Sequence, residues 1–321
     1  MSWLILGATG FVGSAVLQAA EAAGIDVVAL PAPRLTTEAT TAASVAGEAA
    51  THPDLAALTT ALTGASVVVN TAGLAAPRST DTAALRGANA LLPALLAQAC
   101  AAAGVERLVH LSSAAVQGQR DHLDETLNLS PFSAYSRSKA LGEQALQVAP
   151  PGPSVVVVRA TSVQGPHRPT TTALARLAAS PLASVAAPGT AATPVTSVES
   201  LADFVVAVGS YPGAVPAVVL QPSEGMTVRS VLEAAGGTPI VLPRQLCRVI
   251  LRAGYAVSSL AGERLHGSLR RVELMWFGQA QEPGWAEAHG IRVEQKVSAV
   301  LESAASRRRQ GRAGRQPQSP R

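Results

Sequence analysis

The first half of the chain alternates between short apolar runs and longer stretches with helical periodicity. The apolar runs, rich in Val, Leu and Ile, lie at 4–6, 25–30, 66–70, 106–112 and 154–159. The helical patterns, rich in Ala and Leu, lie at 14–23, 54–62, 82–103 and 133–148. Strands that are apolar on both faces and alternate with helices are typical of a parallel sheet covered on both sides. The pattern therefore predicts an α/β fold with a doubly wound parallel sheet.

The alternation weakens beyond residue 160, where five prolines interrupt the chain between 166 and 194. A helix expected at 198–208 and a strand expected at 214–220 can return to the sheet, and the patterns that follow are mostly helical. We therefore expect a sheet domain and a smaller, mostly helical C-terminal lobe. No element is predicted between Pro31 and Pro53. The sheet domain is expected at 1–165 with 196–220 returning to it, and the lobe at 166–195 and 221–305.

Charge is distributed unevenly along the 321 residues. The net charge is +4, but residues 306–321 contain six arginines and no acid, so the rest of the chain carries about 4 − 6 = −2. We expect these last residues to form a disordered basic tail. Aromatic residues make up only 3% of the chain, too few for the stacking surfaces that bind single-stranded nucleic acid. The body of the chain is therefore not expected to bind nucleic acid, and a contact of the tail with nucleic acid or an acidic surface is the alternative.

Apolar residues make up 48% of the chain, enough for a sizeable core. The two cysteines, Cys100 and Cys247, form neither a disulfide framework nor a metal-binding spacing, so we expect no metal site. No signal peptide precedes the first strand, and no window of about 18 uncharged apolar residues occurs. We therefore expect a cytoplasmic protein without a membrane span.

Three glycines, Gly7, Gly10 and Gly13, separate the first strand from the first helix. Glycine at such positions permits a tight turn, the approach of a pyrophosphate to the backbone, and close packing of helix against strand. The N-terminus of the helix then presents N–H groups and a partial positive charge to the phosphates. The sequence therefore predicts a Rossmann-type dinucleotide-binding unit at the start of the chain.

A tyrosine and a lysine, Tyr135 and Lys139, are four residues apart and so lie on one face of a predicted helix. The ammonium group favours the phenolate and lowers the pKa of the tyrosine, which makes it an acid/base for a hydroxyl or carbonyl group. Ser112 and Ser113 end a predicted strand, at the edge where open α/β sheets bind ligands. A serine hydroxyl there can share a proton with Tyr135 and the substrate oxygen.

Together these motifs resemble the extended short-chain dehydrogenase/reductase family, and within it the NAD-dependent epimerase/dehydratase branch. The glycine turn is similar to that family's nucleotide-binding turn, and 131–139 is similar to its Tyr-x-x-x-Lys segment. The resemblance extends over residues 2–166. The other matching positions are the segments 69–73, 111–118 and 159–166, together with Asn89.

The resemblance implies a catalytic set and a cofactor site. It implies that Tyr135 is the acid/base, that Lys139 binds the nicotinamide ribose and lowers the pKa of the tyrosine, and that Ser113 orients the substrate oxygen. A nicotinamide must carry the hydride, because no side chain can. The cofactor-binding residues that we expect are Gly7, Thr9, Gly10, Phe11, Val12, Gly13, Arg34, Ala72, Gly73, Asn89, Ser112, Tyr135 and Lys139.

One departure from the family bears on the choice of cofactor. The acid that would bind the ribose 2′-hydroxyl of NAD after the second strand is missing, and Pro31 stands there. Arg34 follows closely and can pair with a 2′-phosphate. We therefore expect NADP(H) rather than NAD(H), with a solvated loop arginine as the alternative.

We expect an NAD(P)-dependent oxidoreductase that interconverts a secondary alcohol and a ketone, acting as a ketoreductase on a sugar-like small molecule. The alternatives are a redox-neutral NAD-dependent sugar or nucleotide-sugar epimerase, and a non-catalytic NAD(P)-binding sensor. Dehydration is disfavoured because Ala114 and Ala115 follow Ser113 where dehydratases of the family have an Asp-Glu pair. By analogy with the family, the helices at 82–103 and 133–148 are expected to form a homodimer.

The C-terminal third has one feature of its own. Arg244, Arg248 and Arg252 recur every four residues on a predicted helix whose other faces are apolar. This row of arginines can hold an anionic substrate, lie on a membrane surface, or simply be solvated.

Overall fold

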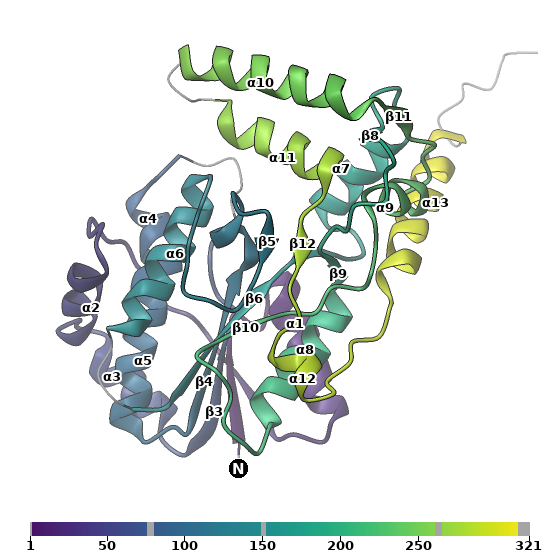
Figure 1. The fold of residues 1–321 in the computed structure, drawn as a ribbon. Helices are drawn as coiled ribbons and strands as arrows, with labels where there is room; N and C mark the ends of the chain where they lie inside the picture. Colours follow the sequence, from purple (N-terminus) through teal and green to yellow (C-terminus); the bar gives the residue numbers. More distant parts are fainter. Residues whose placement is uncertain (1, 76–79, 149–151, 261–264, 314–321) are drawn as a thin grey trace, which may run out of the picture. The chain divides into compact units, whose positions relative to one another are not determined.

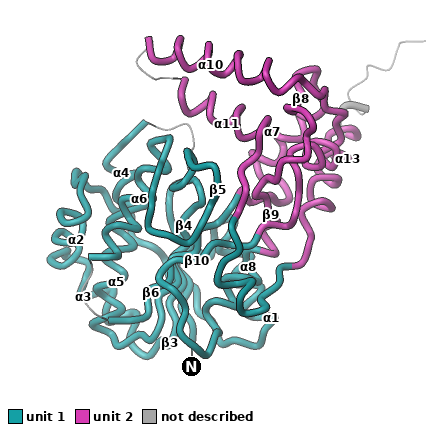
Figure 2. Tube along the Cα trace, in the orientation of Figure 1, with its two compact units in different colours: residues 1–161, 201–222, 282–293 teal, residues 162–200, 223–281, 294–321 magenta. Residues whose placement is uncertain are grey.

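The computed structural model describes residues 2–75, 80–148, 152–260 and 265–313. Two compact units make up the chain (Figure 2). Unit 1 comprises residues 1–161, 201–222 and 282–293, and unit 2 comprises residues 162–200, 223–281 and 294–321.

Unit 1 is built on a parallel sheet, as the apolar runs predict. Within the described residues the sheet has six strands in the order β10-β6-β4-β3-β1-β2, and each pair of neighbours is parallel (Figure 1). This arrangement confirms the doubly wound Rossmann-type fold. The strands are β1 (Ser2–Leu6), β2 (Val27–Leu30), β3 (Ala65–Asn70), β4 (Arg107–Ser113), β6 (Ser154–Ala160) and β10 (Val218–Leu220).

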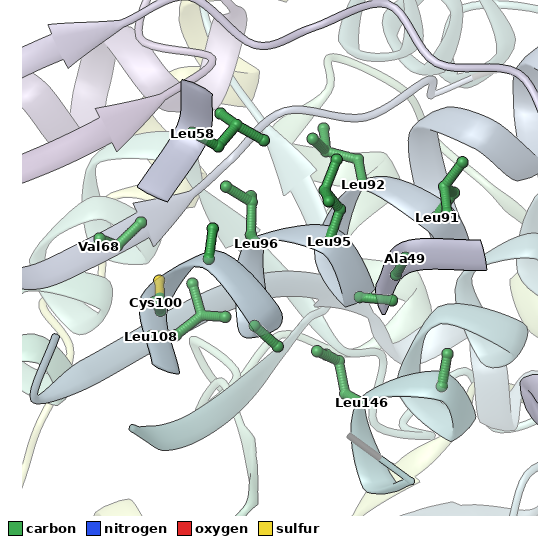
Figure 3. Close-up of a cluster of buried hydrophobic side chains, with 14 of the residues drawn as sticks. Ala49, Leu58, Val68, Leu91, Leu92, Leu95, Leu96, Cys100, Leu108 and Leu146 are labelled. Carbon is green, nitrogen blue, oxygen red and sulfur yellow. The ribbon is translucent and has the colours of Figure 1, made fainter. Parts of the chain in front are cut away.

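Helices cover both faces of the sheet, with α2, α3, α5 and α6 on one side and α1 and α8 on the other (Figure 1). Figure 3 shows the core beneath the first group, where Leu95, Leu96 and Cys100 of α5 meet Val68 of β3 and Leu108 of β4. These apolar side chains are withdrawn from water, which is the main force that holds the layers together. The helices are α1 (Phe11–Ala22), α2 (Ala42–Ala50), α3 (Leu55–Leu62), α4 (Ala83–Arg86), α5 (Leu92–Ala103), α6 (Ala134–Gln147), α8 (Val198–Ser210) and α12 (Trp285–Ala288).

The segment without a predicted element contains the helix α2. Thr41 caps this helix by accepting a hydrogen bond from the backbone N–H of Ser44, and Val45 and Ala49 are buried in the core. Residues 31–40 form neither helix nor strand, and β2 is an edge strand of the sheet in the part of the chain that the structure describes. Many alanines and few large apolar residues hide this helix from a periodicity argument.

The predicted helix at 82–103 is interrupted. A π-helical turn, η1 (Gly87–Leu91), lies between α4 and α5, and Pro93 follows in the first turn of α5. Proline has no N–H to donate to the preceding turn, which agrees with a local change of hydrogen-bond pattern there. At Gly87, a Cβ atom would lie 2.1 Å from the carbonyl oxygen of Leu35, so the backbones approach closely at this turn.

Most of α5 is covered within its own chain. Residues 92–97, 99 and 100 are buried, α2 and α3 pack on α5, and α2 also packs on α6. These residues already take part in packing within the chain, and the homodimer expected through the two helices stays a prediction.

Unit 2 combines short strands with helices. Its cores are apolar clusters, one of which packs Val195 and Val231 against Val297 and Leu301. No helix within the described ranges is both long and apolar enough to cross a membrane. Its elements are β7 (Ser162–Gln164), α7 (Pro169–Ala178), β8 (Ser184–Ala186), β9 (Val195–Ser197), α9 (Val228–Ala234), β11 (Ile240–Leu242), α10 (Arg244–Leu260), α11 (His266–Phe277), β12 (Ala280–Gln281) and α13 (Val297–Ala313).

The boundaries of the units differ from the expected domains by a few residues at 162–165, 196–200 and 221–222, and over longer segments at two further places. Residues 282–293, expected in the lobe, belong to unit 1. The carboxylate of Glu125 holds them there, because it accepts hydrogen bonds from the backbone N–H groups of Leu220 (2.9 Å) and Trp285 (2.8 Å). Residues 306–313, expected in a disordered tail, continue helix α13, whose apolar residues upstream are buried. Residues 314–321 lie outside the described ranges.

A buried ion pair lies inside unit 1. Arg159 of β6 and Glu143 of α6 are both inaccessible to solvent, and Nη2 of the arginine is 2.8 Å from Oε2 of the glutamate. The guanidinium also donates hydrogen bonds to the carbonyl oxygens of Asp124 (3.0 Å) and Thr126 (2.8 Å). The hydroxyl of Ser112 donates to Oε1 of Glu143 at 2.5 Å. One carboxylate therefore joins β4, β6 and α6.

We predict that Glu143→Gln destabilises the protein by about 3–5 kcal/mol, because it leaves the guanidinium of Arg159 buried without its counter-charge. Chemical denaturation measures this loss. The control is Glu38→Gln, which removes an exposed carboxylate 2.7 Å from Arg86 and should cost no more than about 1 kcal/mol. An equal effect of the two substitutions would contradict the prediction.

Candidate active site

The glycine turn after β1 brings the backbone of the first helix close to the sheet. Gly7 has φ +81°, and a Cβ atom there would lie 2.6 Å from the backbone nitrogen of Ala72. At Gly13 a Cβ atom would lie 2.0 Å from the carbonyl oxygen of Gly7. Gly10 is the N-cap residue of α1 and has no side chain with which to cap the helix. The N-terminus of α1 is thus arranged as in sites that bind phosphate.

The end of β3 forms a second part of the site. The hydroxyl of Thr71 donates a 2.7 Å hydrogen bond to the carbonyl oxygen of Leu6, which ties this end of β3 to β1. Two residues further on, a Cβ atom at Gly73 would lie 2.8 Å from Oδ1 of Asn89 and 3.1 Å from Nζ of Lys139. Gly73, Asn89 and Lys139 are therefore brought together, although they come from three separate segments.

Asn89 lies in the π-helical turn and uses both ends of its carboxamide. Its oxygen accepts from the backbone N–H of Leu74 at 3.0 Å, and its nitrogen donates to the carbonyl oxygen of Leu74 and to the hydroxyl of Ser138. These bonds connect the segment after β3 to α6. π-Helical turns within helices frequently occur at functional sites.

Lys139 is 5% exposed, and its Nζ donates a 2.9 Å hydrogen bond to the carbonyl oxygen of Leu111 in β4. Burial lowers the pKa of its ammonium group to about 8, although the negative charge of Glu143 acts in the opposite direction. Burial, together with the nearby charge of Lys139, also lowers the pKa of His110 well below its usual range. His110 is therefore neutral at neutral pH, and its Nδ1 is 3.1 Å from Nδ2 of Asn70.

Tyr135 lies one helical turn before Lys139 on α6 and is half-buried. The start of this helix is defined by a capping box, in which Ser133 and Ser136 each bond the other's backbone N–H. The capping box fixes where α6 begins, and α6 packs against β4 and the short turn at 114–117 that follows this strand. Tyr135 and Lys139 therefore share one face of α6, as their spacing predicts.

The two serines at the end of β4 have different surroundings. Ser112 is 3% exposed, and its hydroxyl is engaged with Glu143. Ser113 is half-buried, and its hydroxyl accepts a 3.2 Å hydrogen bond from the backbone N–H of Ala115. Successive side chains of a strand point to opposite faces, which explains the difference. Of the two hydroxyls, that of Ser113 is the more accessible.

The remaining predicted residues are more exposed. Thr9 is exposed in the glycine turn, and Phe11 and Val12 are half-buried in the first turn of α1. Arg34 is exposed on the segment after β2. The structure does not bring Arg34 into hydrogen-bond or ion-pair contact with another described residue.

Sequence reasoning missed Glu143 as part of this site. A signal for it existed, because Tyr135, Lys139 and Glu143 follow one another at intervals of four and so form one row along α6. Arg159 also carried a signal, since it is a charged residue at the end of an otherwise apolar strand. The described residues include no group of His, Cys, Asp and Glu side chains that is arranged to hold a metal ion.

Comparison with solved structures identifies many chains with this fold. MoeE5 in complex with UDP-glucose and NAD is 22% identical with a TM-score of 0.61, and the match covers 97% of this chain and 99% of that one. UDP-glucuronic acid 4-epimerase from Bacillus cereus, in complex with NAD, is 18% identical with a TM-score of 0.62 over 97% and 99% of the two chains. The human epimerase family protein SDR39U1 with NADPH is 20% identical with a TM-score of 0.62, over 95% and 99%. These likenesses show a shared fold.

The sequence itself provides the assignment to a family. No curated protein sequence matches the chain significantly. The model of the NAD dependent epimerase/dehydratase family, however, matches residues 3–208, which is more than half of the chain and includes the glycine turn and the Tyr-Lys pair. The chain is therefore a member of the NAD dependent epimerase/dehydratase family.

Proposed function

We propose that the protein is an NAD(P)-dependent oxidoreductase that interconverts a secondary alcohol and a ketone on a sugar-like substrate. One observation carries the proposal. Tyr135 and Lys139 share one face of α6, and the ammonium group of Lys139 is bonded to Leu111, two residues before Ser113. A phenol, a buried ammonium and a hydroxyl are thus associated with the carboxyl end of one strand, where open α/β sheets bind their ligands.

In this proposal Tyr135 moves the proton. With a pKa of about 8, Lys139 is mostly charged at neutral pH, and its charge favours the phenolate form of Tyr135. In the reductive direction the phenol gives its proton to the substrate oxygen, and in the oxidative direction the phenolate removes it. Ser113 donates a hydrogen bond to the same oxygen and orients it. A nicotinamide cofactor supplies or accepts the hydride when it is bound.

The glycine turn and the end of β3 fit such a cofactor. The N-terminus of α1 has no capping side chain, and Gly7, Gly13 and Gly73 lie where any Cβ atom would collide with neighbouring atoms. In this proposal the pyrophosphate lies at the uncapped N-terminus of α1, where Gly10 is exposed, and the ribose lies beside Lys139 and the exposed Gly73. Arg34, exposed after β2, is proposed to pair with the 2′-phosphate of NADP(H).

An epimerase remains the second candidate, favoured by the solved structures that share the fold. One of them is a UDP-glucuronic acid 4-epimerase with NAD, and MoeE5 was solved with UDP-glucose and NAD. These ligands also support a sugar-like substrate for this chain. A redox-neutral epimerase regains its hydride in every cycle and need not release its cofactor, whereas a reductase must exchange it. Retention of the nucleotide therefore separates the two candidates.

We predict that Tyr135→Phe lowers turnover about 10²–10⁴-fold, because it removes the acid/base, while the Kd for the cofactor changes less than about twofold. Oxidation of NADPH with a panel of keto sugars and keto sugar nucleotides measures turnover, and fluorescence titration measures binding. Tyr211→Phe is the matched control, since Tyr211 packs edge-on against Trp285 and should retain turnover. Full activity in Tyr135→Phe would contradict the mechanism.

We further predict that the protein purified without added nucleotide contains little NAD and binds NADPH more tightly than NADH. Arg34→Gln should weaken NADPH about tenfold or more and leave NADH unchanged, because one charge-assisted contact to the 2′-phosphate is lost. Nucleotide released by denaturation is identified by chromatography, and binding is measured by titration.

The control is Arg176→Gln, which removes another exposed arginine, from α7, and should alter neither affinity. Near-stoichiometric NAD in the purified protein would favour the epimerase. A protein that binds neither nucleotide would contradict both the reductase and the epimerase. One that binds nucleotide but turns over no substrate would favour a sensor.

The lowered pKa of Lys139 predicts a dependence of stability on pH. The folded chain loses this proton at about pH 8, whereas an unfolded lysine holds it up to about 10.5. Between these values the unfolded chain binds more protons, so the contribution of Lys139 to stability rises with pH. The free energy of unfolding of the wild type relative to Lys139→Met should therefore increase between pH 8 and 10.

The matched control is Lys296→Met, which replaces the other lysine of the chain, a partly exposed one beside Glu294. Its difference from the wild type should stay flat over the same range. Burial raises the pKa of the Cys100 thiol to about 12, which lowers stability at high pH, but this effect is common to all three proteins and cancels. A flat difference for Lys139→Met would contradict the prediction.

A further inference from the structure

Helix α10 is the feature that the proposed function leaves unused. One of its faces is packed inside unit 2. Cys247 and Leu251 of α10 lie in an apolar cluster with Trp276 of α11, and the hydroxyl of Tyr255 donates a 2.9 Å hydrogen bond to Glu273. The buried face accounts for the position of the helix, but not for its remaining apolar side chains.

A second apolar face of α10 is exposed. The exposed fractions are 46% for Leu246, 61% for Val249, 45% for Ile250, 58% for Val257 and 91% for Leu260. At 100° per residue these five side chains fall within a stripe about 100° wide, and the stripe is about 21 Å long at 1.5 Å per residue. Among the described residues, no other helix has so many large apolar side chains exposed.

A row of positive charge lies between this apolar stripe and the buried face of the helix. Arg244, Arg248 and Arg252 recur every four residues, and the helix contains no Asp or Glu. Arg244 stacks on the ring of Phe277, with 5.0 Å from its Cζ to the ring centroid. Arg248 and Arg252 are exposed, and Arg252 borders the stripe because it follows Val249 by three residues.

We propose that α10 attaches the protein to the surface of a bilayer that contains anionic lipids. The apolar stripe enters the boundary between headgroups and acyl chains, and Arg248 and Arg252 bind lipid phosphates beside it. A helix with an apolar face and a basic polar face lies in the plane of such an interface. With 17 residues and three arginines, α10 is suited to lie on the bilayer rather than to cross it.

The chemistry of the stripe favours a lipid surface over a small polar ligand or a second copy of the chain. The stripe consists of aliphatic side chains alone, without the aromatic and convergent polar groups that bind a nucleotide or a sugar. A second copy of α10 would bring another helix with three arginines and no acid against the first, and like charges oppose that contact. Anionic lipid supplies both an apolar interior and negative charge.

The test uses the full-length protein and vesicles of phosphatidylcholine, with or without roughly a third phosphatidylglycerol. Co-sedimentation should show binding that is at least about tenfold stronger to the anionic vesicles. Val257→Ser combined with Leu260→Ser should weaken this binding about tenfold or more. The control removes the same two side-chain types from exposed positions elsewhere, Val148→Ser with Leu182→Ser, and should change binding less than about twofold.

The arginines at 306–321 can attract anionic vesicles by themselves, and every variant retains them. A second readout therefore reports on α10 directly. Trp3, Trp276 and Trp285 are buried, so a tryptophan introduced by Leu260→Trp dominates the response to vesicles. Its emission should shift to shorter wavelength on anionic vesicles, whereas that of Leu182→Trp should not.

Three results would overturn the proposal. They are no binding of the wild type, equal binding of the Val257→Ser/Leu260→Ser variant, and an unchanged spectrum of Leu260→Trp. A dimer in solution that Val257→Ser/Leu260→Ser converts to a monomer would instead assign the stripe to a second copy of the chain.

Discussion

The carboxylate of Glu143 is the point on which unit 1 depends. It is the counter-charge of Arg159 and accepts the hydrogen bond of the Ser112 hydroxyl. Its negative charge also partly offsets the lowering of the Lys139 pKa by burial. A buried charge is costly unless it is paired and hydrogen-bonded, so none of these groups is stable there alone. The same interaction therefore holds β6 and β4 against α6 and keeps a positive charge one turn from Tyr135.

A second constraint is the absence of a Cβ atom at three glycines. Gly7 and Gly13 bring α1 against β1 and the end of β3, and Gly73 lets Asn89 and Lys139 approach the backbone. In each case a single Cβ atom would separate elements that are now in contact. The close packing of α1, β1 and the end of β3 thus depends on backbone that carries no side chain.

The parts of the fold that could be predicted from sequence are those whose signal is local. Apolar runs and helical periodicity predicted the strands of the central sheet and most helices of unit 1, because burial on both faces of a parallel sheet dictates composition directly. The pairing of Arg159 with Glu143 joins residues 16 positions apart on different elements, and nothing local in either segment specifies the partner. Helix α2 was missed because alanine is compatible with many environments, and the end of α13 because its arginines resemble those of a disordered tail.

The candidate site divides in the same way. The shared face of Tyr135 and Lys139 was predictable because four residues make about one helical turn, and the greater exposure of Ser113 than of Ser112 agrees with the alternation of side chains along β4. The catalytic roles of these residues stay a prediction. Glu143 continues the row of Tyr135 and Lys139 along α6. A charged residue on a helix is usually solvated, however, and only the burial of its side chain distinguishes Glu143 from such a residue.

Helix α10 presents the opposite physical situation to Glu143. The polar groups around Glu143 are buried and satisfied by one another, whereas α10 leaves apolar groups in water and positive charges without acids on the same helix. Exposed aliphatic side chains scattered singly need no explanation, since much of any protein surface is apolar. A continuous stripe bordered by arginines is different, because its members contribute little to the stability of the fold while they remain in water. The burial that stabilises such a stripe has to come from outside the chain, and the arginines beside it, which no acid on the same helix neutralises, favour a surface that is negative as well as apolar.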